Sequence, residues 1–158
     1  MSNKRRPPSA RQLPAGRPSQ RGVGLIEVLV AVLVLAIGLL GIAGLQSRAL
    51  MNGQSAFERS QAVTLTYLMM DAMRANVVPA RTGQYNINKT CSVSAGSTLI
   101  TNDHRLWMQS LKQTLGDRDT TCGEINCQGD RCAVRIYWDD SRGTEGSDNQ
   151  MVETISVL

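Results

Sequence analysis

A single carboxylate, Glu27, lies within an otherwise uncharged apolar run that extends from Val23 to Leu45. A carboxylate inside hydrocarbon costs about 3 kcal/mol on insertion scales, so such groups usually mark a function. One interpretation is that Glu27 reaches the nearby water interface, since it lies only four residues from Val23. The other is that it needs a cation as its partner where staggered helices pack together and no interface is near.

The second set of reactive side chains consists of four cysteines, Cys91, Cys122, Cys127 and Cys132. Disulfides persist in oxidising compartments such as the periplasm, and they stabilise small domains with few large apolar residues. The spacing lacks the short C-x₂-C knuckle of zinc sites, so we predict no metal. Three pairings are open. We favour Cys127–Cys132 across a turn, which leaves Cys91–Cys122 to tie the loop after the long helix to a sheet.

Other candidates for chemistry are few. His104 is the sole histidine and is interpreted as a surface or capping residue at a helix start. The stretch Asp139–Asn149 is acidic, but it does not match calcium-loop spacing and is interpreted as an exposed loop. No set of nucleophile and base is discernible. We therefore predict no catalytic residue, no metal and no cofactor.

Charge separates the N-terminus from the rest of the chain. Six basic residues and no acidic ones lie in residues 1–22, whereas the remainder carries a net charge of −2. The body thus lacks the basic excess expected of a nucleic-acid-binding domain. A helix over Val23–Leu45 spans about 34 Å, enough to cross a bilayer. The basic residues before it predict a cytoplasmic N-terminus by the positive-inside rule.

Helical character continues past the membrane span. An apolar position recurs every seven residues, with two more beside it, which predicts one buried helix face; the residues are Ala49, Ala56, Val63, Met70, Val77, Tyr67 and Met73. Pro79 and Gly83 are predicted to end this helix. The expected organisation is an unstructured leader over 1–22, a membrane half over 23–45, an amphipathic half over 46–78 and a globular domain over 79–158.

The globular domain is predicted to contain a second helix and three strands. The helix covers His104–Leu115, is capped by Asn102 or Asp103, and presents Trp107, Leu111 and Leu115 on one face. Alternating residues predict strands over Gly123–Asn126, Ala133–Trp138 and Thr154–Val157, with a turn at Gln128–Arg131; Ala80–Ile100 is read as a loop with short strands. The fold class is therefore α+β, with a long helix packed on a small antiparallel sheet.

Three glycines, Gly38, Gly41 and Gly44, lie in the second half of the membrane span. Glycine is ordinary in transmembrane helices and allows close helix packing. The alternative is that they mark a point where the helix bends or unwinds during packing.

The segment Gly22-Val23-Gly24-Leu25-Ile26-Glu27 combines a preceding basic leader, a glycine, and a glutamate at the fifth position of the apolar run. It resembles the class III signal of type IV prepilins and type II secretion pseudopilins, although those families usually begin with Phe or Met and then Thr. The resemblance implies cleavage after Gly22 by a prepilin peptidase and N-methylation of Val23. It also implies that Glu27 pairs with the Val23 α-amino group of a neighbouring subunit, in competition with its own.

Further segments resemble the PilV-type minor pilins, the type IV pilus modification proteins; these are Val28–Ala31, Leu35–Gln46, Asp71–Asn76, Trp107 with Leu111, and Tyr137–Ser141. The resemblance implies a subunit that starts in the inner membrane, with its C-terminal domain in the periplasm. It would assemble with other minor pilins and the major pilin to prime a type IV pilus, and lie at the tip with an adhesin. The alternatives are a minor pseudopilin of a type II secretion system and a membrane-anchored periplasmic enzyme or receptor.

Overall fold

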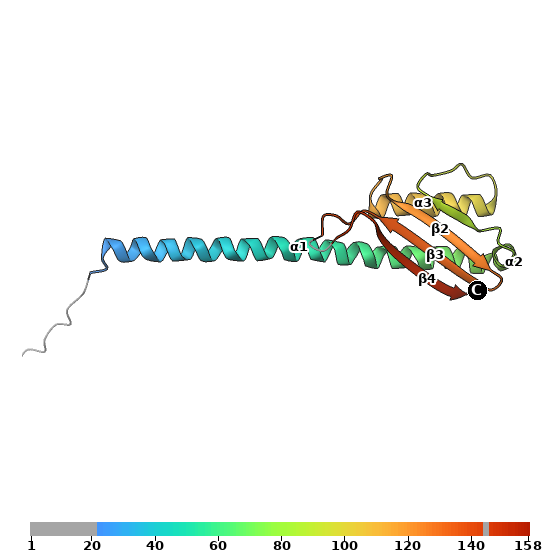
Figure 1. Cartoon of the computed structure of the whole chain (residues 1–158). Helices are drawn as coiled ribbons and strands as arrows, with labels where there is room; N and C mark the ends of the chain where they lie inside the picture. The colour runs from blue at the N-terminus through green and yellow to red at the C-terminus, as the bar shows by residue number, and fades with distance from the viewer. Residues whose placement is uncertain (1–21, 144–145) are drawn as a thin grey trace, which may run out of the picture. The chain divides into compact units, whose positions relative to one another are not determined.

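The computed structural model describes residues 22–143 and 146–158. The predicted leader, apart from Gly22, lies outside these residues. The elements are α1 (Leu25–Ala75), α2 (Val77–Arg81), β1 (Ile87–Thr90), α3 (Leu99–Leu115), β2 (Cys122–Gln128), β3 (Arg131–Trp138) and β4 (Gln150–Val157); Figure 1 labels all of them except β1. The chain divides into two compact units, one up to Leu40 and one from Gly41 to Leu158.

In the first unit, α1 begins at Leu25 and contains only one charged residue, Glu27, in its first turn. Its large apolar side chains are exposed along the whole stretch, with Leu25 88% exposed. Within the described residues, α1 is the one helix long and apolar enough to cross a membrane. Exposed apolar surface of this extent needs a non-aqueous environment or other helices around it.

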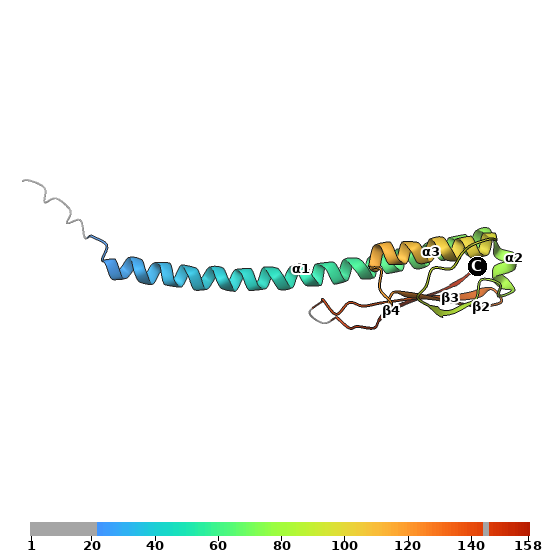
Figure 2. The same ribbon diagram turned by 90° about the horizontal axis from the view of Figure 1, so that it is seen from above.

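In the second unit, four antiparallel strands form a sheet in the order β1-β2-β3-β4. α3 and the part of α1 beyond Gly41 lie on the same face of the sheet, as the view from above shows (Figure 2). The β2–β3 hairpin turns through Gly129 and Asp130, and Gly129 takes the positive φ of 59° that a two-residue turn requires at its first position. The α+β class, with a long helix on a small antiparallel sheet, is thereby confirmed.

The core of this unit is formed by side chains of α1, α3, β2 and β3, together with Ala80 of α2 and Tyr85 of the following turn. On α1 the buried residues are Glu58, Ala62, Leu65, Thr66, Met69, Met70 and Met73, a stripe with the three- and four-residue spacing of a straight helix. The predicted heptad face was wrong for most of its length: Ala49, Ala56, Val63 and Tyr67 are exposed, and only Met70 and Met73 of the predicted set are buried on α1. A strict seven-residue repeat drifts around a straight helix, so it tracks the buried face for only a short distance.

α1 ends at Ala75, before the predicted end at Pro79. Asn76 leaves the helical conformation, and its side-chain amide donates to the Tyr85 hydroxyl at 3.1 Å. Pro79 lies inside the short helix α2, where its missing N–H is tolerated because early helical N–H groups have no helical partner. The chain therefore turns at Asn76, and Pro79 lies in the first turn of a new helix rather than ending the old one.

α3 begins at Leu99, five residues before its predicted start. Its N-cap is Thr98, not Asn102 or Asp103, and Thr98 and Thr101 form a reciprocal capping box. Threonine replaces the usual Glu or Gln at the third position, which explains why the motif was missed. The predicted buried face is confirmed, since Trp107, Leu111 and Leu115 are at most 3% exposed.

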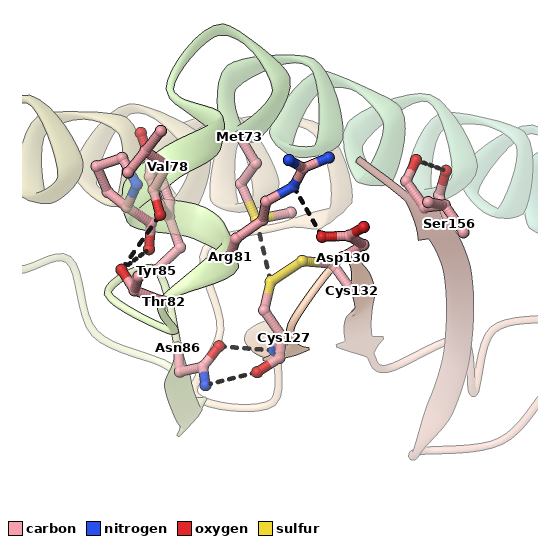
Figure 3. The surroundings of a disulfide bond; sticks show 12 residues. Met73, Val78, Arg81, Thr82, Tyr85, Asn86, Cys127, Asp130, Cys132 and Ser156 are labelled. Atoms are coloured by element: carbon pink, nitrogen blue, oxygen red, sulfur yellow. Dashed lines mark hydrogen bonds and ion pairs between the residues drawn. A yellow bond between two sulfur atoms is a disulfide. The ribbon is translucent and has the colours of Figure 1, made fainter.

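All three predicted strands are present and extend beyond their predicted limits. β1 adds a fourth strand at one edge. Its pairing with β2 is completed by Asn86, whose side-chain amide donates to Cys127 O at 3.2 Å and accepts from Cys127 N at 2.6 Å, as Figure 3 shows. The Asn86 side chain thus pairs with the β2 backbone at Cys127 in the way that a strand residue would.

The interpretation of Asp139–Asn149 as a wholly exposed loop was wrong for Asp140, which is buried at 3% exposure. Its carboxylate accepts a hydrogen bond from the Ser55 hydroxyl and lies 4.0 Å from Arg59 Nε. Nearby, Arg142 contacts Glu58 Oε1 at 3.4 Å. Polar residues of α1 therefore hold the start of this loop in place. The hydropathy of the sequence does not predict these contacts.

A glycine on β2 sets how closely α3 approaches the sheet. A Cβ at Gly123 would lie 2.5 Å from two ring atoms of Trp107, a side chain that is only 1% exposed. The indole also donates to Leu65 O at 2.9 Å, which fixes the ring between α1 and β2. The ring therefore has little room to move away from an added methyl group.

Gly123→Ala is therefore expected to destabilise the folded unit by about 1–3 kcal/mol, the usual cost of overpacking a core. The measurement is chemical unfolding of the detergent-solubilised full chain, followed by near-ultraviolet circular dichroism. Gly53→Ala is the matched control, because a Cβ at this helical position meets no atom within 4 Å. A loss of stability equal in both variants would contradict the close contact.

Candidate functional site

The first part of the candidate site is the segment that leads into α1. Gly22 and Val23 precede the helix, which is anchored by Gly24 O accepting from Glu27 N at 3.0 Å and Val28 N at 3.3 Å. The Gly22–Val23 peptide bond therefore lies outside regular structure. Val23 is 68% exposed. A bond in exposed, non-helical backbone is accessible to a peptidase.

Within the part of the chain that the structure describes, nothing requires a glycine at position 22. Within the described residues, a Cβ there would meet no atom within 4 Å, and the residue does not take a positive φ. The two ordinary structural reasons for a glycine, a close contact and a left-handed backbone, are both absent from the described part. The described residues thus give no structural reason for a glycine at position 22.

Glu27 lies in the first turn of α1, where the partial positive charge of a helix N-terminus favours a carboxylate. Among the described residues its carboxylate makes no hydrogen bond or ion pair. The side chain is thus available for a partner on another chain. α1 continues through Gly38, Gly41 and Gly44 without interruption, and a Cβ at each would meet no atom within 4 Å. Small residues with open space beside them suit close approach of a second helix.

The second part is the pair of disulfides in the C-terminal unit. The structure joins Cys91 to Cys122 and Cys127 to Cys132, the two pairings that the spacing favours. Cys127 and Cys132 are direct cross-strand partners in the β2–β3 hairpin. Figure 3 shows this disulfide beside Met73 of α1, whose Sδ lies 3.7 Å from Cys127 Sγ. Together the two bonds hold the segment after β1, the hairpin and the helix face in one core.

His104 lies in the second turn of α3 rather than at its cap. Its ring packs edge-on against Tyr85, with centroids 5.6 Å apart, and Nε2 contacts Tyr85 O at 3.1 Å. The fully buried Tyr85 donates its hydroxyl to Asp103 Oδ2 at 2.7 Å. Burial, followed by the bond to Asp103, raises the Tyr85 pKa. This cluster was not predicted, because nothing in the local sequence distinguishes Tyr85 from an exposed tyrosine.

Burial lowers the His104 pKa below its usual value, although the bond to Tyr85 O opposes the shift. The unfolded chain then binds more protons than the folded chain as the pH falls, so stability is full above about pH 6.5 and declines below it. His104→Gln, which retains an amide donor, is expected to reduce this decline. Thermal midpoints of both chains between about pH 7 and pH 5 measure it; parallel curves would contradict the contribution of His104.

The arrangement defines a class of protein: an exposed apolar helix with one carboxylate at its start, continued by a disulfide-bearing α+β unit with pilin-like architecture. Residues 17–43 match the family model described as the prokaryotic N-terminal methylation motif. This motif, which contains Gly22, Val23 and Glu27, indicates a type IV pilin or a pseudopilin. It implies processing by a prepilin peptidase and assembly with other pilins, and with α1 it is consistent with membrane anchoring. Comparisons with curated proteins and with solved structures gave no match.

Proposed function

We propose that this chain is a minor pilin that co-assembles with other minor pilins to prime a type IV pilus and lies at or near its tip. The observation that carries the proposal is the methylation motif at residues 17–43, placed at the start of an apolar helix whose only charge there is Glu27. In this function the chain starts in the bacterial inner membrane with its N-terminus in the cytoplasm. Its C-terminal unit lies in the periplasm, where both disulfides are stable.

The proposed role is structural, and the chain performs no catalysis. Two described groups of the kind that enzymes use, an imidazole and a buried carboxylate, make structural contacts. His104 lies against Tyr85, and Asp140 is bonded to Ser55 and Arg59. The proposed partners are the major pilin, other minor pilins, a tip adhesin and the prepilin peptidase.

The test is to shear pili from the cell surface, enrich the tip fraction, and identify its members by mass spectrometry. The proposal expects this chain in the tip fraction at a low ratio to the major pilin, with an N-terminus at Val23. A strain lacking the chain should display few surface pili. Normal piliation combined with loss of protein secretion would instead identify a minor pseudopilin of a type II secretion system.

A further inference from the structure

We propose that the free edge of β4 binds an extended segment of a different protein chain, which adds to the sheet as a fifth strand. β4 lies at one edge of the sheet, opposite β1 (Figure 1). This edge would be a further contact surface of the filament subunit, so the proposal rests on the proposed function.

The register of β4 shows which of its backbone groups are unpaired. Leu158 N donates to Asp130 O at 2.9 Å, so this pair marks the hydrogen-bonded positions that alternate along the β3–β4 ladder. Even-numbered residues of β4 therefore bond to β3. Within the described residues, the odd-numbered residues Met151, Glu153 and Ile155 direct their N–H and C=O groups to the free edge. Val157 directs its N–H there, while its C=O accepts from the Ser156 hydroxyl.

The same odd-numbered residues place their side chains on the outer face of the sheet. Three of the four are apolar, and Met151, Ile155 and Val157 are 48%, 48% and 67% exposed. The inner face of β4 is more polar, with Thr154 and Ser156 bonded to Thr66 and Arg74 of α1 at 2.7 and 2.8 Å. In a strand whose outer face is in water, the polar side chains point outward and the apolar ones inward, and β4 has the opposite arrangement. It fits a strand whose outer surface is partly covered by a neighbour.

The two edges of the sheet differ in how they are protected from pairing. β1 has four residues, an irregular register against β2, and a lysine, Lys89. Short length, irregularity and lysine are devices that prevent edge-to-edge association. β4 has eight residues in unbroken register with β3, contains no proline or lysine, and is held on its inner side by α1. Of the two sheet edges in the described residues, the β4 edge is therefore the unprotected template for another strand.

The occupant is a different chain rather than a second copy. The Thr66–Thr154 and Arg74–Ser156 bonds show that β4 runs in the same direction as α1 of this unit. Pairing two copies of β4 antiparallel about a two-fold axis would reverse one α1 relative to the other. Two subunits that leave the same membrane through their N-terminal helices do not meet in that way.

The surface around β4 defines the chemistry of the added segment. Alternate apolar side chains would cover Met151 and Ile155, and a long side chain could enter the open depression that Ala133, Arg135 and Ile155 help to line. The exposed Arg131 lies opposite Val157 on the outer face, so an acidic residue at that end is favoured.

The test places a photo-crosslinking benzoylphenylalanine at Met151, Ile155 or Val157 of the full chain in cells that produce it. Each probe is expected to join the same segment of another protein. Moving the probe by two residues should move the attachment point by two residues, as strand pairing requires. Adducts between two copies of this chain, attachment points without that spacing, or no adduct at any of the three positions would overturn the proposal.

Matched substitutions separate edge pairing from general effects on the sheet. With the probe at Val157, Ile155→Lys should reduce the adduct about tenfold or more, since a charge then faces the added strand. Asn126→Lys should not, although Asn126 belongs to the same cross-strand row on the same face, because it lies on β2. Glu153→Pro, which removes one edge N–H without breaking the β3 ladder, should also abolish the adduct. Equal effects of Ile155→Lys and Asn126→Lys, or adducts that persist with Glu153→Pro, would refute strand addition.

The outcome is distinguishable from failure of the proposed function. A chain found in sheared pili but lacking β4 adducts refutes strand addition and leaves the minor-pilin function standing. A chain with regularly spaced β4 adducts that is absent from pili supports strand addition and refutes the function.

Discussion

Gly22→Val is expected to leave the chain uncut, so that the form beginning at Val23 disappears and the longer precursor accumulates in the membrane. The physical reason is local. A branched side chain next to the peptide bond blocks the close approach that a glycine permits, while the described fold provides no contact that the new side chain would disturb. Gel mobility and N-terminal sequencing of the membrane-extracted chain measure the effect, because the two forms differ by 22 residues.

Gly24→Thr is the control for this experiment. Gly24 lies two residues away, does not take a positive φ, and would place a Cβ 3.9 Å from the Ile26 side chain, an ordinary contact. Cleavage should persist in this variant. A Gly22→Val variant whose mature form still begins at Val23 would contradict the hypothesis of prepilin processing. A wild-type mature chain that begins at another residue would contradict it too.

Glu27→Val should separate assembly from insertion. Removing the charge makes the span more apolar, so membrane insertion should be retained, and cleavage should continue because the cut lies upstream. Co-assembly should fail, because the α-amino group of a neighbouring Val23 loses its counter-charge in a low-dielectric setting. Removing one partner of a buried ion pair costs about 3–5 kcal/mol, equivalent to a loss of more than about a hundredfold in association.

The measurement compares the amount of Glu27→Val protein in sheared pili with the amount in the inner membrane. Few surface pili and a normal membrane level are expected. Glu27→Asp should restore assembly only in part, since the shorter side chain has less reach, and Ile26→Val serves as a neutral neighbouring change. Normal piliation by Glu27→Val, with the protein present in filaments, would mean that Glu27 is an interfacial residue without a partner.

The long helix, the hairpin and the helix-start motif were predictable because each depends on residues close together in sequence. Each of these signals lies within a short stretch of sequence. They are an apolar run whose only charge is Glu27, a turn flanked by two cysteines, and a glycine five residues before a glutamate. The class of fold follows from these elements, since a helix with one apolar face and several alternating strands must bury those faces together.

Other features depended on contacts between distant segments and could not be predicted. Asn76, where α1 ends, is bonded to Tyr85, and the buried Asp140 contacts Ser55 and Arg59. The buried face of α1 was misassigned at four positions, because apolar residues occur on more than one side of the helix and only packing selects between them; these are Ala49, Ala56, Val63 and Tyr67. The edge position of β4 likewise follows from strand order, which alternation alone does not determine.

The core contains several methionine thioethers, and their oxidation state would report whether the chain was oxidised before or after it folded. Met69, Met70, Met73 and Met108 are at most 2% exposed, whereas Met51 and Met151 are 45% and 48% exposed. In an oxidising compartment, exposed methionines acquire sulfoxide while buried ones are protected. A sulfoxide at Met73 would therefore identify a chain that was oxidised before it folded. Such a chain would carry a polar group into the contact with the Cys127–Cys132 disulfide and could not repack the same core.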